Sequence, residues 1–209
     1  MSQRTYLGFL PWVVFAFVGR GMGEGVAWGG VVALLTAVVV TVTSSRAGTV
    51  SGLELSAIVL FTGFAIAGSL NQHDPQGFLQ HYCRAMSAAG LALIALVSLR
   101  YSPITEPYAR EIVLKKFWDT PRFKRVNIEL TLIWAMVFSA IALSNVAGAA
   151  IDTRLGGTVF NWIVPVALAL LGVRQSSLRW SEQFDTEAMG LDAMLNQVEF
   201  WDSGDSSAF

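Results

Sequence analysis

Glu129 is the ionisable residue of this sequence whose position most suggests chemistry. It lies in the stretch KKFWDTPRFKRVNIELTLIW, directly before the apolar run LTLIWAMVFSAIAL and four residues after Arg125. Ionisable side chains at membrane depth are costly and often functional. A pair with Arg125, at the i, i+4 spacing of a helix, would instead satisfy the charge structurally. Two interpretations remain open: a salt bridge at the membrane boundary, or a carboxylate that handles a proton or a substrate.

Arg20 and Glu24 form a second pair of opposite charges, in the glycine-rich stretch GRGMGEG. Their spacing would bring them together on a helix, but the glycines favour a tight irregular turn. The stretch is either a small ion or substrate site on the outer side of a membrane, or a flexible turn with two solvated charges.

Three asparagines, Asn127, Asn145 and Asn161, lie within or beside apolar runs. Amide side chains in such positions hydrogen-bond between membrane helices. We expect these residues to hold the helices together, which is a structural role.

Metal-capable side chains gather in the stretch NQHDPQGFLQHYCR, which contains His73, Asp74, His81 and Cys83. Their spacing matches neither a tetrahedral zinc pattern nor two histidines on successive helical turns, and a proline and a glycine between them oppose a continuous helix. Motifs for a serine nucleophile, a phosphate-binding loop or a zinc protease do not occur in the sequence. We therefore predict no catalytic, cofactor-binding or metal-ligating residues and no enzymatic activity.

The elements that carry these residues are predicted from composition. Of the 209 residues, 54% are hydrophobic and 14% charged, and the mean hydropathy is +0.53, which is typical of an integral membrane protein. We predict an all-α transmembrane bundle with six membrane segments. The apolar runs span 6–19, 25–43, 55–70, 85–99, 130–151 and 155–173. The first run is short and contains Pro11, so it either crosses the membrane or enters it as a re-entrant helix.

Lysine and arginine near the ends of these runs predict the orientation, because such residues are retained on the cytoplasmic side. With the N-terminus inside, 11 cations fall in inner segments and 3, namely Arg20, Arg84 and Arg154, fall in outer links, which accounts for all 14. This split predicts that both termini are cytoplasmic.

Residues 1–179 form the predicted transmembrane domain, with a basic cytoplasmic link at 100–125. Within this link, Tyr108, Ile112, Val113 and Phe117 fall roughly on one helical face and cations on the other. The pattern favours a helix in the headgroup layer facing anionic lipid, and a solvated loop is the alternative.

Proline ends this predicted link helix. We expect Pro121 to break it, and the fifth membrane helix to begin near Asn127. Residues 180–209 contain seven acids and no cation, and they predict an acidic, partly disordered cytoplasmic tail with a short amphipathic helix around 182–200.

The order of these motifs resembles the bacterial intracellular septation protein A family of small inner-membrane proteins. The resemblance rests on FLPWVVFAF, on VAWGGVVALLTAVVV, on WDTPRFKRVNIELTLIWAMVFSAIALSNVAGA and on FNWIVPVALALLG. It spans roughly residues 8–173 and is that of a distant relative, because the basic link and the acidic tail are longer here. The family offers no catalytic residues to carry over.

The resemblance implies a multi-pass protein of the bacterial inner membrane, involved in cell-envelope maintenance or division. We expect a non-enzymatic protein that contacts lipids and other membrane proteins or a second copy of itself. A small transporter or lipid-handling protein, and an accessory subunit of a larger complex, are the alternatives. Nucleic acid is not an expected partner, because topology explains the basic cluster.

Overall fold

The computed structural model describes residues 3–19, 25–46, 50–71, 77–111, 113–151 and 153–179, and within these ranges it contains helices and no strand. The chain divides into two compact units, residues 1–172 and residues 173–209. The helices of the first unit are α1 (Gln3–Val18), α2 (Gly25–Arg46), α3 (Gly52–Leu70), α4 (Phe78–Ser98), α5 (Glu106–Arg110), a 3-10 turn (Lys115–Phe117), α6 (Pro121–Ile151), α7 (Arg154–Thr158) and a π-helical turn (Val159–Ile163).

Within the described residues, five helices are long and apolar enough to cross a membrane, and a shorter apolar helix, Leu7–Val18, precedes them. The five are α2, α3, α4, α6 and the helix Leu155–Arg179, which begins within α7 and continues through the π-helical turn. The predicted all-α membrane bundle is therefore confirmed, and the protein has the architecture of a multi-pass membrane protein.

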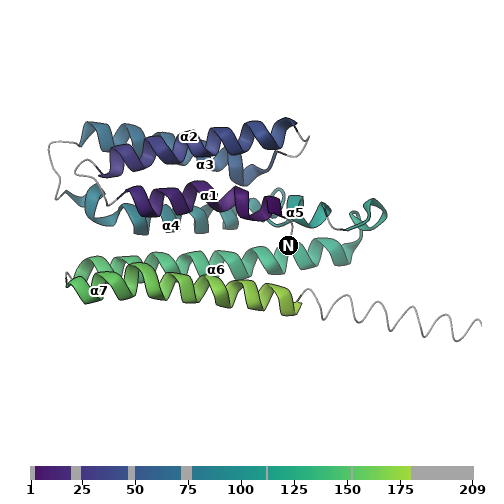
Figure 1. Ribbon diagram of the computed structural model, residues 1–209. Coiled ribbons are helices and arrows are strands. Elements are labelled where there is room, and N and C mark those ends of the chain that lie inside the picture. Colours follow the sequence, from purple (N-terminus) through teal and green to yellow (C-terminus); the bar gives the residue numbers. More distant parts are fainter. Residues whose placement is uncertain are drawn as a thin grey trace, which may run out of the picture. The chain divides into compact units, whose positions relative to one another are not determined.

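The bundle of the first unit has two ends, which tertiary contacts identify. At the α5 end, the last turn of α2 meets the first turn of α3, and the link after α4 contacts the start of α6. At the opposite end, Val26 N of α2 donates to Oε1 of Gln80 in α4 at 3.2 Å, and the ring of His81 lies 3.0 Å from the carbonyl oxygen of Ala149 in α6. Successive long helices thus run in alternating directions (Figure 1).

The α1 helix runs between these two ends and does not turn back on itself. Gly8 lies beside Tyr108 and Leu53 at the α5 end, whereas Gly19 lies beside Gly25 at the opposite end. The helix continues through Pro11, whose side chain is fully buried. Its 16 residues span about 24 Å, less than the roughly 30 Å of a hydrocarbon core. The structure thus shows α1 as one continuous helix that runs from one end of the bundle to the other.

Small residues allow α2 and α3 to approach closely. A Cβ atom on Gly30 would lie 2.5 Å from the backbone nitrogen of Ala65, and one on Gly68 would lie 2.5 Å from that of Ala27. Each helix thus places a glycine and an alanine three residues apart against its partner, which is the usual way in which membrane helices gain packing contacts. Next to this contact, Phe15 of α1 packs on Phe64 of α3 with ring centroids 4.7 Å apart.

The structure corrects the prediction that His81 and Cys83 lie in an irregular link. Gly77 is the N-cap of α4, with extended backbone angles, and α4 begins at Phe78, before the apolar run 85–99. His81 and Cys83 are therefore helical and do not belong to an irregular link. Residues 72–76, which include His73 and Asp74, lie outside the described residues. The prediction failed because polar residues on α4 find partners on other helices, which hydropathy does not register.

The link 100–125 is also corrected. Instead of one interfacial helix it contains the five-residue α5 and a three-residue 3-10 turn, and Leu114 between them has extended backbone angles of φ −58° and ψ 137°. Pro121 is the first residue of α6 rather than a break before a helix that starts near Asn127. Proline suits this first position because its missing N–H would have no helical partner there.

The second unit begins at Val173, and the structure describes it as far as Arg179. These residues continue the last long helix, and the Ser177 hydroxyl donates to the carbonyl oxygen of Val173 at 3.0 Å. The predicted acidic tail, 180–209, lies outside the described residues.

Candidate functional site

Glu129 and Arg125 do not form the expected salt bridge, although both lie in the described part of α6. An ion pair is formed instead between Glu106 and Arg110 of α5. Glu129 is half-buried and Arg125 is exposed. An exposed i, i+4 pair gains little energy and costs side-chain entropy, so the spacing did not suffice to bring the two groups together.

Asn127 is the predicted residue that the structure places most firmly. It is fully buried, and its Nδ2 donates to the carbonyl oxygen of Phe123 at 2.8 Å. The hydroxyl of Thr105, the residue before α5, lies 3.1 Å from Oδ1 of Asn127 and 3.1 Å from the hydroxyl of Thr131. Asn127 therefore fastens the link between α4 and α5 onto α6. Its hydrogen-bond partner is a link residue rather than another membrane helix, which differs from the predicted contact between helices.

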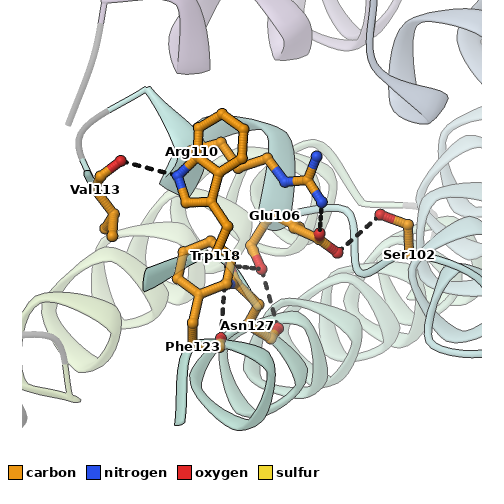
Figure 2. A network of polar contacts seen from close by, with 8 residues as sticks. Ser102, Glu106, Arg110, Val113, Trp118, Phe123 and Asn127 are labelled. Carbon is orange, nitrogen blue, oxygen red and sulfur yellow. Dashed lines mark hydrogen bonds and ion pairs between the residues drawn. The ribbon is translucent and has the colours of Figure 1, made fainter. Parts of the chain in front are cut away.

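A second set of contacts folds the rest of the link, as Figure 2 shows. Glu106 accepts hydrogen bonds from Ser102 and Arg110, and the Arg110 guanidinium lies over the Trp118 ring, 5.0 Å from its centroid. The indole Nε1 of Trp118 donates to the carbonyl oxygen of Val113 at 2.9 Å. These contacts replace the helical hydrogen bonds that the predicted interfacial helix would have made.

Glu54, which the sequence analysis did not single out, is the buried carboxylate at the α5 end. Only 5% of its surface is exposed. Its Oε1 accepts a 2.9 Å hydrogen bond from the Ser44 hydroxyl, whereas its Oε2 has no hydrogen-bond partner among the described residues. Within the same residues, no cation pairs with it. Burial of a carboxylate with so few hydrogen bonds is costly, which sets Glu54 apart from the exposed acids of the chain.

Tyr108 lies beside this carboxylate. Burial raises the pKa of its phenol from 10.0 to about 12, the neighbouring Ser51 hydroxyl lowers it slightly, and the negative charges of Glu54 and Glu111 raise it. Although Ser51 is close, the Tyr108 hydroxyl makes no well-formed hydrogen bond within the described part of the chain. Glu54, Ser44, Ser51 and Tyr108 form the candidate functional site, which has proton donors and acceptors but no catalytic arrangement.

A sequence signal for Glu54 did exist. The pattern Ser-x-x-Glu at residues 51–54, directly before an apolar run, is the capping-box signature of a helix start. Ser51 is indeed the N-cap of α3, and its side chain accepts from the backbone N–H of Glu54 at 3.3 Å. The carboxylate bonds to Ser44 of α2, and this is the part that only the tertiary structure reveals.

At the opposite end, Asn145 and Asn161 are placed against the contact between α6 and the last long helix. Asn145 is 7% exposed, and neither its Oδ1 nor the Nδ2 of Asn161 has a hydrogen-bond partner in the described ranges. The hydrogen bond across this contact comes from Ser144, whose hydroxyl donates to the carbonyl oxygen of Phe160 in the π-helical turn at 2.6 Å. The sequence pattern predicted that Asn145 and Asn161 hydrogen-bond between helices, whereas Ser144 makes the observed hydrogen bond.

Arg84 is the cation that the structure places inside the opposite end. Its Nη2 donates to the carbonyl oxygen of Ala16 in α1 at 2.6 Å, and its guanidinium lies 4.7 Å from the centroid of the Trp162 ring. It thus joins α1, α4 and the last long helix. Arg20 and Glu24, the predicted outer pair, lie outside the described residues.

The described residues contain no group of three or more histidine, cysteine, aspartate or glutamate side chains placed to hold a metal ion. His81 lies against the carbonyl oxygen of Ala149, and Cys83 is a buried free cysteine.

Comparison of the chain with models of protein families, with curated proteins and with solved structures finds no match. The resemblance to the intracellular septation protein A family therefore stays a prediction from the sequence.

Proposed function

We propose that the protein is a non-enzymatic, multi-pass protein of a bacterial cytoplasmic membrane that acts through contacts with other membrane proteins in maintaining or dividing the cell envelope. The observation that carries this proposal is the sparse packing of the last long helix, Leu155–Arg179. In its most apolar window 6% of the residues are buried inside the chain, against 39–44% in the other four spanning helices.

The exposed surface of this helix forms a stripe. Ile163, Val166 and Leu170 follow the i, i+3, i+7 pattern of one helical face, and each is more than half exposed. Within 155–172, Gly172 is the one buried residue. A membrane helix with so few contacts to its own bundle has most of its surface available for a neighbouring protein. The sequence resemblance to septation protein A supports the same cellular role.

Site-specific photocrosslinking in the native membrane tests this proposal. A photoreactive residue at Ile163 or Leu170 is expected to give a discrete adduct with an envelope or division protein, or with a second copy of the chain. The matched control is Val59 on α3, which is 74% exposed on a different helix and is expected to give no adduct. Absence of adducts at both positions, together with unchanged cell shape and division after gene deletion, would overturn the proposal.

A second function, proton-linked transport, is favoured by the unpartnered oxygen of Glu54. Ionisable groups buried in membrane bundles often carry protons. The test uses proteoliposomes loaded with a pH-sensitive dye, across which a membrane potential is applied. Proton entry is expected with the wild-type protein and not with Glu54→Gln. Proton entry no faster than in empty liposomes would exclude this function and leave the first proposal untouched.

A further inference from the structure

Residues 113–125, which we term the basic elbow, join α5 to the first turns of α6. The elbow contains five cations and one acid: Lys115, Lys116, Arg122, Lys124, Arg125 and Asp119. All six side chains are exposed. The elbow is therefore a dense patch of positive charge, which would be complemented by an anionic partner.

The elbow has a defined fold. The hydrogen bond from Trp118 to Val113 closes it on one side, and the 3-10 turn Lys115–Phe117 shapes its tip. On the other side, the Thr120 hydroxyl accepts from the backbone N–H of Phe123 at 3.3 Å and so caps α6. These hydrogen bonds and the 3-10 turn define the backbone conformation of the segment that carries the cations.

Its cations are also placed where a helix favours negative charge. Lys124 and Arg125 lie in the first turns of α6, the end at which the helix dipole is positive. Neither cation is in an ion pair with a described residue. The helix end and the side chains therefore add up to one electropositive surface, which is suited to phosphate groups.

Exposed apolar side chains accompany these charges. Leu114 is 66% exposed and Phe117 is 38% exposed, and they flank Lys115 and Lys116 in the sequence. Apolar residues beside lysines are typical of segments that lie at the boundary between lipid headgroups and acyl chains. A nucleic acid would match the charges but would leave these apolar side chains in water.

The length of α6 places the elbow at the correct depth. Its 31 residues span about 46 Å, whereas a hydrocarbon core is roughly 30 Å thick. The first turns of α6 contain Arg122, Lys124 and Arg125, whereas its last turns contain no charged residue. The excess length is therefore assigned to the elbow end, at the level of the headgroups.

We propose that the basic elbow is a binding site for anionic phospholipid headgroups, with the lysines and Arg125 on phosphate and with Leu114 and Phe117 inserted beside the acyl chains. This inference does not depend on the proposed envelope function. It replaces the predicted amphipathic helix with a folded element, a 3-10 turn followed by the start of α6, that binds the same class of lipid.

The experiment measures lipid retention by native mass spectrometry on the full chain, purified in mild detergent and titrated with phosphatidylglycerol or phosphatidylcholine. The wild-type protein is expected to prefer phosphatidylglycerol, and added salt is expected to weaken the preference. Lys115→Gln with Lys116→Gln is expected to reduce phosphatidylglycerol binding about tenfold or more. The matched control is Arg46→Gln with Arg100→Gln, two exposed cations at the α5 end but outside the elbow.

One further double variant separates the effect of charge from that of insertion. Leu114→Ser with Phe117→Ser keeps every cation and is expected to weaken binding of both lipids by a similar factor. Equal phosphatidylglycerol binding by wild type and the double lysine variant, or an equal loss in the arginine control, would overturn the proposal. So would binding of an acidic peptide or an oligonucleotide that is as tight as binding of phosphatidylglycerol.

Discussion

The hydroxyl of Ser44 donates a 2.9 Å hydrogen bond to Oε1 of Glu54, and this bond joins the last turn of α2 to the first turn of α3. It is the one hydrogen bond from a side chain to this buried carboxylate among the described residues. The α2–α3 helix pair is therefore joined at this end by a hydrogen bond to a buried carboxylate.

Removal of this contact should cost more when Glu54 is a carboxylate than when it is an amide. We expect Ser44→Ala to lower the free energy of unfolding by about 1.5–3 kcal/mol in the wild type, and by about 1 kcal/mol or less beside Glu54→Gln. Unfolding in detergent measures both. Ser45→Ala is the control, since the Ser45 hydroxyl bonds locally to the carbonyl oxygen of Val42. If Ser44→Ala lowers the free energy of unfolding equally with Glu54 and with Glu54→Gln, the Ser44 hydrogen bond is no stronger to the carboxylate than to the amide.

Asn127→Ala should destabilise the protein by about 2–3 kcal/mol, because it removes the hydrogen bonds of the buried Asn127 side chain with the Thr105 hydroxyl and with the Phe123 carbonyl oxygen. It should also speed proteolysis of the link 99–120. Asn145→Ala is the matched control, because Asn145 is similarly buried but its Oδ1 has no partner in the described ranges. If both variants lose the same stability and the link stays protected, the anchoring role of Asn127 is wrong.

Gly68→Ala should separate α2 from α3, because the added methyl group would meet the backbone of Ala27. We expect a loss of about 1–3 kcal/mol. Gly63→Ala, on the same helix, has nothing within 4 Å of its new Cβ and should be neutral or slightly stabilising through helix propensity. Thermal unfolding of the two variants in detergent compares them directly. A neutral Gly68→Ala variant would contradict the close approach.

Tyr108 predicts a loss of stability at alkaline pH. Its pKa is 10.0 in the unfolded chain and about 12 in the folded protein, so between these values the unfolded state has fewer protons bound. Stability is therefore intact below pH 10 and falls as the pH rises towards 12, by up to about 2–3 kcal/mol. Tyrosinate absorbance and unfolding experiments on wild type and Tyr108→Phe measure this. If Tyr108→Phe loses the same stability at alkaline pH as the wild type, the loss comes from other titrating groups.

Arg125 and Glu129 should behave independently. In a double-mutant cycle with Arg125→Gln and Glu129→Gln, we expect a coupling energy below about 0.3 kcal/mol, since the structure shows no ion pair between them. Unfolding of the four proteins at low salt gives the coupling. A value of about 0.5 kcal/mol or more would restore the boundary salt bridge that their spacing suggested.

The cation count and the structure agree on which parts of the chain lie together. Nine of the eleven lysines and arginines at described positions of residues 1–172 fall at the α5 end, whereas Arg84 and Arg154 fall at the opposite end. This distribution of cations between the two ends could be predicted from the sequence, because the number of crossing segments alone decides at which end each link lies. The orientation itself, with the α5 end cytoplasmic, remains a prediction from the positive-inside tendency.

By itself, the sequence determined the helical class, the number of apolar segments and the dense charge of residues 113–125. These properties depend on hydropathy and length, which are local. The tertiary structure decided which polar groups meet: Ser44 with Glu54, ten residues apart, and Thr105 with Asn127, twenty-two apart. It also folded the stretch after α5 into an elbow, because the Trp118 indole bonds to Val113 where a helix would have continued. Such contacts depend on how the chain packs, and helical periodicity alone does not specify them.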